Sequence, residues 1–280
     1  MIRDIEISQD WKQKLDSFYS RISGSVVRHI FLLPKSFARW MDLFYWPLID
    51  LLLWGYTTVY LNSQSHSGIN FVVLFIGALI SWDILFRAQQ SVTITFLEDV
   101  WARNTLNLFV SPLTPTEFLI SSITYGMLRH FVTISFMGLM AFWLYNYNYF
   151  SLGFYLIPAI LNLLLFGWSL GIVTTALILR FGQAGEMLAW GLAFLIQPFI
   201  GVFYPVETLP KAFQVVSKFL PPTYVFTELR EIVLNKHFIP GLVLKAFALN
   251  AVYLLLAGIF FNWLWRIVKN MGYLTRLGNE

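Results

Sequence analysis

Four charged residues interrupt long apolar stretches in the first half of the chain, namely Asp50, Asp83, Arg87 and Arg129. A lone charge in hydrocarbon is costly, so such residues pair with one another or face a polar path, where they can relay ions or protons. With about 1.5 Å of rise per helical residue, Asp50 and Arg87 lie at similar depths, and so do Asp83 and Arg129. We therefore expect the interhelical pairs Asp50–Arg87 and Asp83–Arg129, with Asp83–Arg87 as an i, i+4 alternative. Two roles stay open for these pairs: they lock helix packing, or they line a translocation path.

Catalytic and metal-binding patterns are missing from the sequence. The glycines near Gly182, Gly185 and Gly201 lack the lysine and the strand context of a G-x-x-x-x-G-K-[ST] phosphate-binding loop, so this chain is not expected to hydrolyse ATP. Serines within apolar runs, such as Ser81, are more typical of helix packing than of nucleophiles. There is no cysteine, and the four histidines are too scattered to form a ligand set. We expect no catalytic residue, no metal site and no cofactor bound by the chain itself.

The composition points to a membrane protein rather than to a large soluble core. Of the 280 residues, 58% are hydrophobic and only 12% are charged, whereas soluble domains are about 25% charged. Long unbroken apolar runs such as 71–80 favour helices over the alternating pattern of a β-barrel. The net charge of +4 comes mainly from residues that flank apolar runs, so no nucleic-acid partner is expected. The sequence thus predicts an all-α integral membrane fold in contact with lipid.

Six stretches are candidates for crossing a bilayer, which takes about 20 apolar residues per helix. They divide the chain into a lead-in over 1–42, a transmembrane domain over 43–265 and a tail over 266–280. Pro198 is expected to kink the fifth span, and Gly167 and Gly171 form a G-x-x-x-G match in the fourth, a weak packing signal. The six expected spans are Leu43–Leu61, Phe71–Phe96, Phe118–Tyr145, Phe154–Leu179, Met187–Tyr204 and Leu242–Trp265.

Lysine and arginine residues outside the spans set the expected orientation. The lead-in carries seven of them, whereas the short loops 62–70 and 146–153 carry none. The tail places Arg266, Lys269 and Arg276 on the same side as the lead-in. We therefore expect a multi-pass protein of the plasma (inner) membrane with both termini in the cytoplasm.

Two polar segments on the expected cytoplasmic side carry amphipathic patterns. Apolar residues recur at helical spacing around Arg28 in the lead-in, as in a helix that lies in the membrane interface; a soluble amphipathic helix is the alternative. Glu98–Ser122 is the only long polar interruption in the first half of the chain. It contains a short amphipathic stretch after Asp99 and Arg103, which predicts a short cytoplasmic helix between the second and third spans.

The segment 205–241, expected on the opposite side of the membrane, is more than an ordinary loop. Apolar residues repeat at helical spacing on either side of Pro221 and Pro222. This pattern predicts two short amphipathic helices, each too short to cross the bilayer. We expect them to re-enter the outer leaflet or to pack across the ends of the spans, and a pair of surface helices in water is the alternative.

These segments together resemble the membrane subunits of ABC exporters of the second type (the polysaccharide and drug exporter family), also called type V exporters. The resemblance covers about residues 22–268. One stretch that carries it is 32–47, at the start of the first span, and a second is Glu98–Ser122, with Arg103-Asn-Thr-Leu and Val110-Ser-Pro-Leu. The third and most specific contains Gly201-Val-Phe-Tyr-Pro205 and Leu220-Pro-Pro-Thr-Tyr224. Many members of that family have glycine where this chain has Asn104, a departure that concerns the shape of one turn.

The resemblance implies a homodimer of permeases with two copies of a separate ABC ATPase, which binds ATP and Mg²⁺. It also implies that the lead-in helix and the loop after the second span contact the ATPase, and that the paired outer helices cap the path. The residues it nominates for ATPase coupling are Arg28, Glu98, Asp99, Arg103, Asn104, Thr105, Leu106 and Pro112. The residues it nominates for the outer gate region are Pro205, Pro210, Pro221, Pro222, Tyr224, Glu228 and Arg230.

The leading prediction is a permease that exports an amphipathic substrate with energy from a separate ATPase. Drugs, lipids and lipid-linked glycans all remain open as substrates. The alternative is an ion-coupled secondary transporter or channel that uses Asp50, Asp83 and Arg129 as a relay, although the inverted repeats of many such folds are not found. An intramembrane enzyme is a third class, and no cluster of His, Asp or Ser supports it.

Overall fold

The computed structural model describes residues 2–64 and 71–271, with side chains from Lys14 onward except those of residues 105, 106, 109 and 183. Within these ranges the chain is mostly helical and has no strand, as an all-α membrane fold requires. Among the described helices, four regions are long and apolar enough to cross a membrane. They are α4 (Phe71–Trp101), α6 (Pro115–Tyr145), α7 (Leu156–Phe181) with the preceding 3-10 helix η3 (Tyr149–Tyr155), and α11 (Pro240–Asn270).

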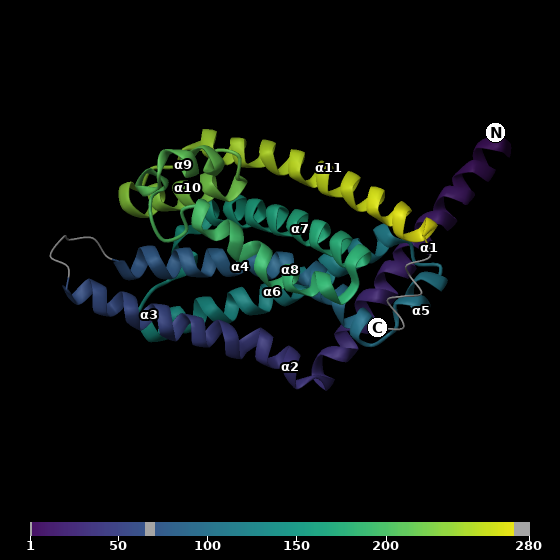
Figure 1. Ribbon diagram of the computed structural model, residues 1–280, viewed down its shortest axis with the longest axis horizontal. Coiled ribbons are helices and arrows are strands. Elements are labelled where there is room, and N and C mark those ends of the chain that lie inside the picture. The colour runs from purple at the N-terminus through teal and green to yellow at the C-terminus, as the bar shows by residue number, and fades with distance from the viewer. Residues whose placement is uncertain (1, 65–70, 272–280) are drawn as a thin grey trace.

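Helices α4 and α7 form the centre of the bundle, with α11 packed along α7 and α6 packed against α4 (Figure 1). The two central helices approach closely because of the G-x-x-x-G motif. A Cβ atom added at Gly167 would lie 2.6 Å from the carbonyl oxygen of Leu85, and one added at Gly171 would lie 2.8 Å from that of Gln89. Glycine is therefore required at both positions for this backbone contact, as in other close helix pairs in membranes.

The lead-in is one long helix followed by several short ones. Helix α1 packs against α6, and the chain then turns through short helices into α3. The last of these short helices has π-type hydrogen bonding, which is rare and is often found at functional sites. The elements are α1 (Ile2–Leu32), η1 (Leu33–Lys35), α2 (Phe37–Trp40), the π-helix η2 (Met41–Tyr45) and α3 (Trp46–Gln64).

Two of the six expected spans, the first and the fifth, have no counterpart among the four long apolar regions. The first corresponds to α3, which has 19 residues and is not among those four. The fifth was expected over Met187–Tyr204, but α8 (Glu186–Ile196) tightens into the 3-10 helix η5 (Gln197–Phe199) at Pro198. The proline ring and its missing N–H end the α-helical bonding there. The prediction of one continuous helix to Tyr204 was therefore wrong. Helices α8 and η5 together rise only about 20 Å.

The segments expected to serve as coupling and gate regions lie at opposite ends of the bundle (Figure 1). Helices α1 and α5 (Thr105–Val110) are at one end, where the α4–α6 connection lies. At the other end, two short helices occupy the segment expected to hold a pair. They are α9 (Lys211–Ser217) and α10 (Pro221–Asn235), preceded by the 3-10 helix η6 (Val206–Thr208).

Replacing Gly167 with alanine should lower the free energy of unfolding by about 1–3 kcal/mol, because the added methyl group overpacks the α4–α7 contact. The control is Gly191→Ala in α8, where an added Cβ meets nothing within 4 Å. Denaturant unfolding in detergent compares the two variants. Equal stability of Gly167→Ala and Gly191→Ala would contradict the close contact.

Candidate functional site

Ion pairs join the lead-in to both ends of the α4–α6 connection. Arg21 of α1 donates to both carboxylate oxygens of Glu117, with 2.6 Å between Nη2 and Oε1. Arg39 of α2 donates to both oxygens of Glu98, at 3.0 Å and 2.7 Å. Two-point contacts of this kind fix orientation as well as charge. They hold the lead-in against α4 and α6, the two helices that the connection joins.

Glu117 has a second role at the start of α6. Its Oε2 accepts a hydrogen bond from the backbone N–H of Thr114 at 2.8 Å, and its own N–H donates to the Thr114 hydroxyl at 3.3 Å. This reciprocal capping box satisfies N–H groups that have no partner within the first helical turn. The start of α6 and the docking of α1 therefore depend on the same carboxylate.

The turn between α4 and α5 is built around Asp99, which is buried. Its carboxylate accepts hydrogen bonds from Arg28 of α1 and, at 3.0 Å, from Nδ2 of Asn104. Arg103 takes the left-handed backbone conformation, with φ 53°, whereas Asn104 has φ −97° and needs no glycine. Asp99 thus holds the turn inside this chain, while Arg103 points to the exposed surface available to a partner.

A groove of about 380 Å³ lies between α1 and the α4–α6 connection. Arg28, Asn104 and the exposed Pro112 line it, so three residues nominated for ATPase coupling come together here. The side chains of Thr105 and Leu106 lie outside the described residues. Among the described cavities, this groove is the one lined by both α1 and the α4–α6 connection, the two segments expected to contact an ATPase.

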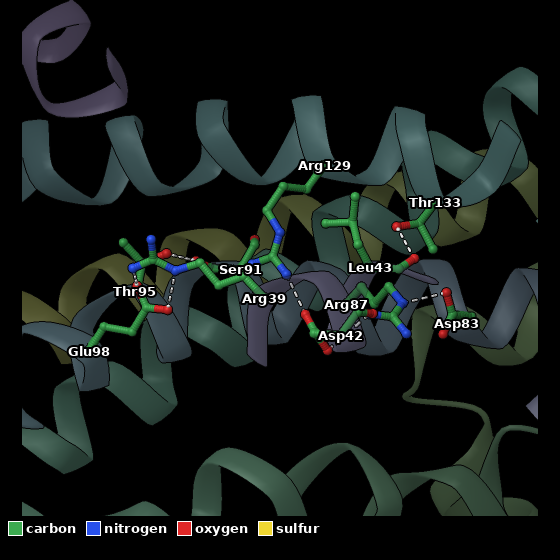
Figure 2. A network of polar contacts seen from close by, with 10 residues as sticks. All are labelled: Arg39, Asp42, Leu43, Asp83, Arg87, Ser91, Thr95, Glu98, Arg129 and Thr133. Atoms are coloured by element: carbon green, nitrogen blue, oxygen red, sulfur yellow. Dashed lines mark hydrogen bonds and ion pairs between the residues drawn. The ribbon is translucent and has the colours of Figure 1, made fainter. Parts of the chain in front are cut away.

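A second charge cluster centres on Asp42, in the π-helix η2 (Figure 2). Its carboxylate accepts hydrogen bonds from Arg129 of α6 and, at 3.2 Å, from Nη1 of Arg87 in α4. The same Nη1 donates to the Asp42 carbonyl oxygen at 2.7 Å. On its other side, Nε of Arg87 donates to Asp83 at 2.7 Å, one turn away on the same helix. The four side chains link η2, directly before α3, to α4 and α6.

The cluster corrects the interhelical pairs expected from the sequence. Asp83 pairs with Arg87 rather than with Arg129, which confirms the i, i+4 alternative. Arg129 pairs with Asp42, and Asp50 is on an exposed position of α3 instead of pairing with Arg87. The physical reason is that the π-helical turn carries Asp42, which precedes the first expected span, to the two arginines.

Beside the Asp42 cluster lies a cavity of about 670 Å³, which we call the arginine cavity. It lies between the lead-in, α4, α6 and α8, and Trp46, Trp101 and Trp190 line it as half-exposed side chains. Its charged lining residues are Arg39, Asp42, Arg87, Glu98 and Arg129.

The residues nominated for the outer gate mostly stabilise the α9–α10 end of the bundle. Tyr224 donates to the carbonyl oxygen of Lys218 at 2.8 Å, and Arg230 donates to that of Gly201 at 2.9 Å. Glu228 is buried, and its Oε1 accepts the N–H of Ile239 at 2.7 Å. Burial raises the pKa of Glu228. Of the nominated prolines, Pro221 and Pro222 are buried at the start of α10, whereas Pro205 and Pro210 are exposed.

Residues 53–267 match the family described as ABC-2 family transporter protein. The match covers most of the chain, including three of the long apolar regions and all of α11 except its last three residues. The chain belongs to the ABC-2 transporter family. Comparison with curated proteins finds no match. Members of the ABC-2 family are the permease components of ABC transporters and not the ATPases, so this chain is a membrane permease of the ABC-2 type. Membership of the family implies partnership with an ABC ATPase.

Four functional candidates in this ABC-2 permease were not identified in the sequence analysis: Arg21, Arg39, Asp42 and Glu117. Arg21 and Arg39 of the lead-in make ion pairs with Glu117 and Glu98, and Asp42 organises the charge cluster. The available signal was the spacing of Arg39 and Asp42, three residues apart and directly before an apolar run. Interpreting that run as the start of a span placed both residues outside the bundle.

Arg28→Ala should reduce the free energy of unfolding by about 1–3 kcal/mol, because the buried Asp99 carboxylate loses a charged donor. Arg103→Ala removes the same side chain from an exposed position of the same turn and should change stability by less than about 0.5 kcal/mol. Unfolding of the purified permease in detergent measures both. A loss for Arg103→Ala as large as that for Arg28→Ala would contradict the role assigned to Asp99.

The docking of α1 should weaken in acid because His29 is buried against α6. Burial lowers the pKa of His29, although the bond between Nδ1 and the Ser25 carbonyl oxygen, at 2.8 Å, opposes this shift. A lowered pKa means that the stabilisation is complete above the ordinary value of about 6.5 and is lost as the pH falls below it. Protease cleavage of α1 at pH 7.5 and at pH 5 measures the docking.

His29→Asn is the control for the acid experiment, because asparagine does not titrate. We expect the acid-induced increase in cleavage to be smaller in His29→Asn than in the unmodified chain. An identical increase in both proteins would assign the pH dependence to other groups, such as the carboxylates of the nearby ion pairs.

Proposed function

We propose that this chain is the membrane subunit of an ATP-driven exporter, and that its ATPase subunit docks on the groove between α1 and the α4–α6 connection. The observation that carries the proposal is the set of ion pairs Arg21–Glu117, Arg28–Asp99 and Arg39–Glu98. They tie the lead-in beside the groove to the end of α4 and the start of α6. A force applied at the groove is thus passed to two long helices as rigid bodies.

The proposed topology has six spans, with α3 and α8 completing the four long apolar regions. The arginine and lysine residues of the lead-in and tail favour a cytoplasmic location for both termini. The α1–α5 end then faces the ATP pool of the cell, and the α9–α10 end faces outward. In this arrangement α9 and α10 re-enter or cover the outer leaflet and close the path.

The proposed assembly is a homodimer of permeases with two ATPase subunits, which bind ATP and Mg²⁺. Support comes from membership of the ABC-2 family and from the sequence, which offers no phosphate-binding loop of its own. The cargo is amphipathic, because the arginine cavity presents charged groups and tryptophan rings side by side. A charge cluster buried between helices can also have a purely structural role. Both carboxylates of the Asp42 cluster, those of Asp42 and Asp83, already accept hydrogen bonds from arginines, as such a role requires.

Cross-linking tests the docking site directly, because the chain contains no cysteine. A single cysteine replaces Ser111, which is exposed on the groove, or Thr208, which is exposed at the opposite end. We expect a short thiol–amine cross-linker to join Ser111→Cys, but not Thr208→Cys, to the co-purified ATPase subunit.

The contrary results are equally specific. Cross-linking through Thr208→Cys alone would overturn the proposed orientation of the ATPase. Transport by the reconstituted chain without any ATPase would favour the ion-coupled alternative, in which Asp50, Asp83 and Arg129 act as a relay.

A further inference from the structure

The arginine cavity contains polar atoms that the protein does not satisfy. Nε of Arg129, Nε2 of His130 and Oε1 of Gln90 are buried and have no hydrogen-bond partner in the described part of the chain. His130 is 5% exposed, and all three residues line the cavity. Buried polar groups are nearly always paired, and a group left without a partner costs free energy. These atoms therefore mark a place where another polar molecule belongs.

The charges on the wall decide the sign of that molecule. Arg39 and Glu98 satisfy each other through their two-point contact. Two guanidinium groups, those of Arg87 and Arg129, then share the single carboxylate of Asp42 at the cavity. Asp83 compensates Arg87 too, but it does not line the cavity. Among the lining side chains guanidinium groups thus outnumber carboxylates by three to two. This positive excess favours an anion, whereas Oε1 of Gln90 is an acceptor and would face a donor.

Asp42 shows how an oxyanion fits between the two arginines. One of its carboxylate oxygens accepts from Arg87 and the other from Arg129, so the two guanidinium groups converge from different helices (Figure 2). Its side chain is 46% exposed, which leaves room for a second oxyanion to approach or replace it. Arginine forks match the oxygens of phosphate especially well.

The apolar part of the ligand is indicated by the cavity's shape and its tryptophans. Along α4 the lining runs from Arg87 to Trp101, a rise of about 20 Å. Trp46, Trp101 and Trp190 are half-exposed along it, and tryptophan is typical of sites where a polar end meets an apolar body. A volume of about 670 Å³ exceeds what a single small ion fills.

We propose that the arginine cavity binds the phosphate group of an amphipathic molecule, held by Arg87 and Arg129 in competition with Asp42. The interpretation of this cavity as a substrate site rests on the proposed export function. Binding itself needs no ATPase, so a failure of this test and a failure of ATPase docking are separate results.

The test measures dissociation constants for the full chain in a neutral maltoside detergent by microscale thermophoresis. Dioctanoyl phosphatidate is the probe, and inorganic phosphate and dioctanoylglycerol supply its two halves separately. Arg129→Gln should weaken phosphatidate binding about tenfold or more, because it removes a charged donor to the phosphate. Arg266→Gln is the matched control, since it removes the same charge from an exposed position of α11.

Asp42→Asn separates a binding role from a merely structural one. Removing the competing carboxylate should tighten phosphatidate binding, whereas a cluster that only locks packing would give weaker binding or none. Arg129→Lys keeps the charge and serves if Arg129→Gln fails to fold, with weakening again expected because lysine lacks the guanidinium fork.

Each outcome has a defined consequence. Inorganic phosphate that binds as tightly as phosphatidate would overturn the amphipathic part of the proposal and assign the phosphate site to the free ion. Dioctanoylglycerol that binds as tightly as phosphatidate overturns the proposal, and so does equal binding by Arg129→Gln and Arg266→Gln. Loss of binding in Asp42→Asn, with the protein still folded, overturns it as well.

Discussion

The structure depends on one constraint: a charge removed from water must meet an opposite charge in a fixed geometry. Carboxylates at both ends of the α4–α6 connection meet arginines of the lead-in, and Asp42 meets two arginines of the bundle. Burying an unpaired charge costs several kcal/mol, so each of these contacts restricts how helices slide past one another. The lead-in is thereby held against the helical bundle.

This constraint connects the two regions with a proposed function. Arg39 and Asp42 lie three residues apart in α2 and η2. The first holds Glu98, which lines the cavity and directly precedes Asp99, whose partners Arg28 and Asn104 line the groove. The second holds Arg87 and Arg129 of the cavity. In the proposed mechanism, a change in how an ATPase grips the α1–α5 end reaches the arginine cavity through one short segment, which contains the π-helical turn. The coupling and binding regions are physically continuous, although they were predicted from unrelated features of the sequence.

Hydrophobic length was sufficient to predict most of the fold. Four of the six expected spans are found in α4, α6, α7 and α11, because each contains an apolar run long enough to stand out in any window. Pro198 was expected to kink the fifth span, but its effect on the helix is larger. Helix α8 tightens into η5 and ends there instead of continuing with a kink. The G-x-x-x-G match was a weak signal that the α4–α7 contact confirms.

Side-chain partners were harder to predict, for a geometric reason. Depth along a helix does not reveal the direction in which a side chain points, so Asp50 and Asp83 were matched to the wrong arginines. The resemblance nominated Asp99 for contact with the ATPase, yet Arg28 and Asn104 hold its carboxylate inside this chain. Non-helical details, such as the left-handed Arg103 and the π-helix at Asp42, decide these positions, and no periodicity in the sequence encodes them.

The central claim is that the ion-paired lead-in transmits the action of an ATPase to α4. A charge swap at Arg39 and Glu98 tests it most directly, measured as the permease-dependent ATPase rate of the reconstituted complex. The account predicts that Arg39→Glu and Glu98→Arg each reduce this rate and that the double variant restores most of it. Unchanged rates in the single variants, or a double variant no better than either one, would contradict the account.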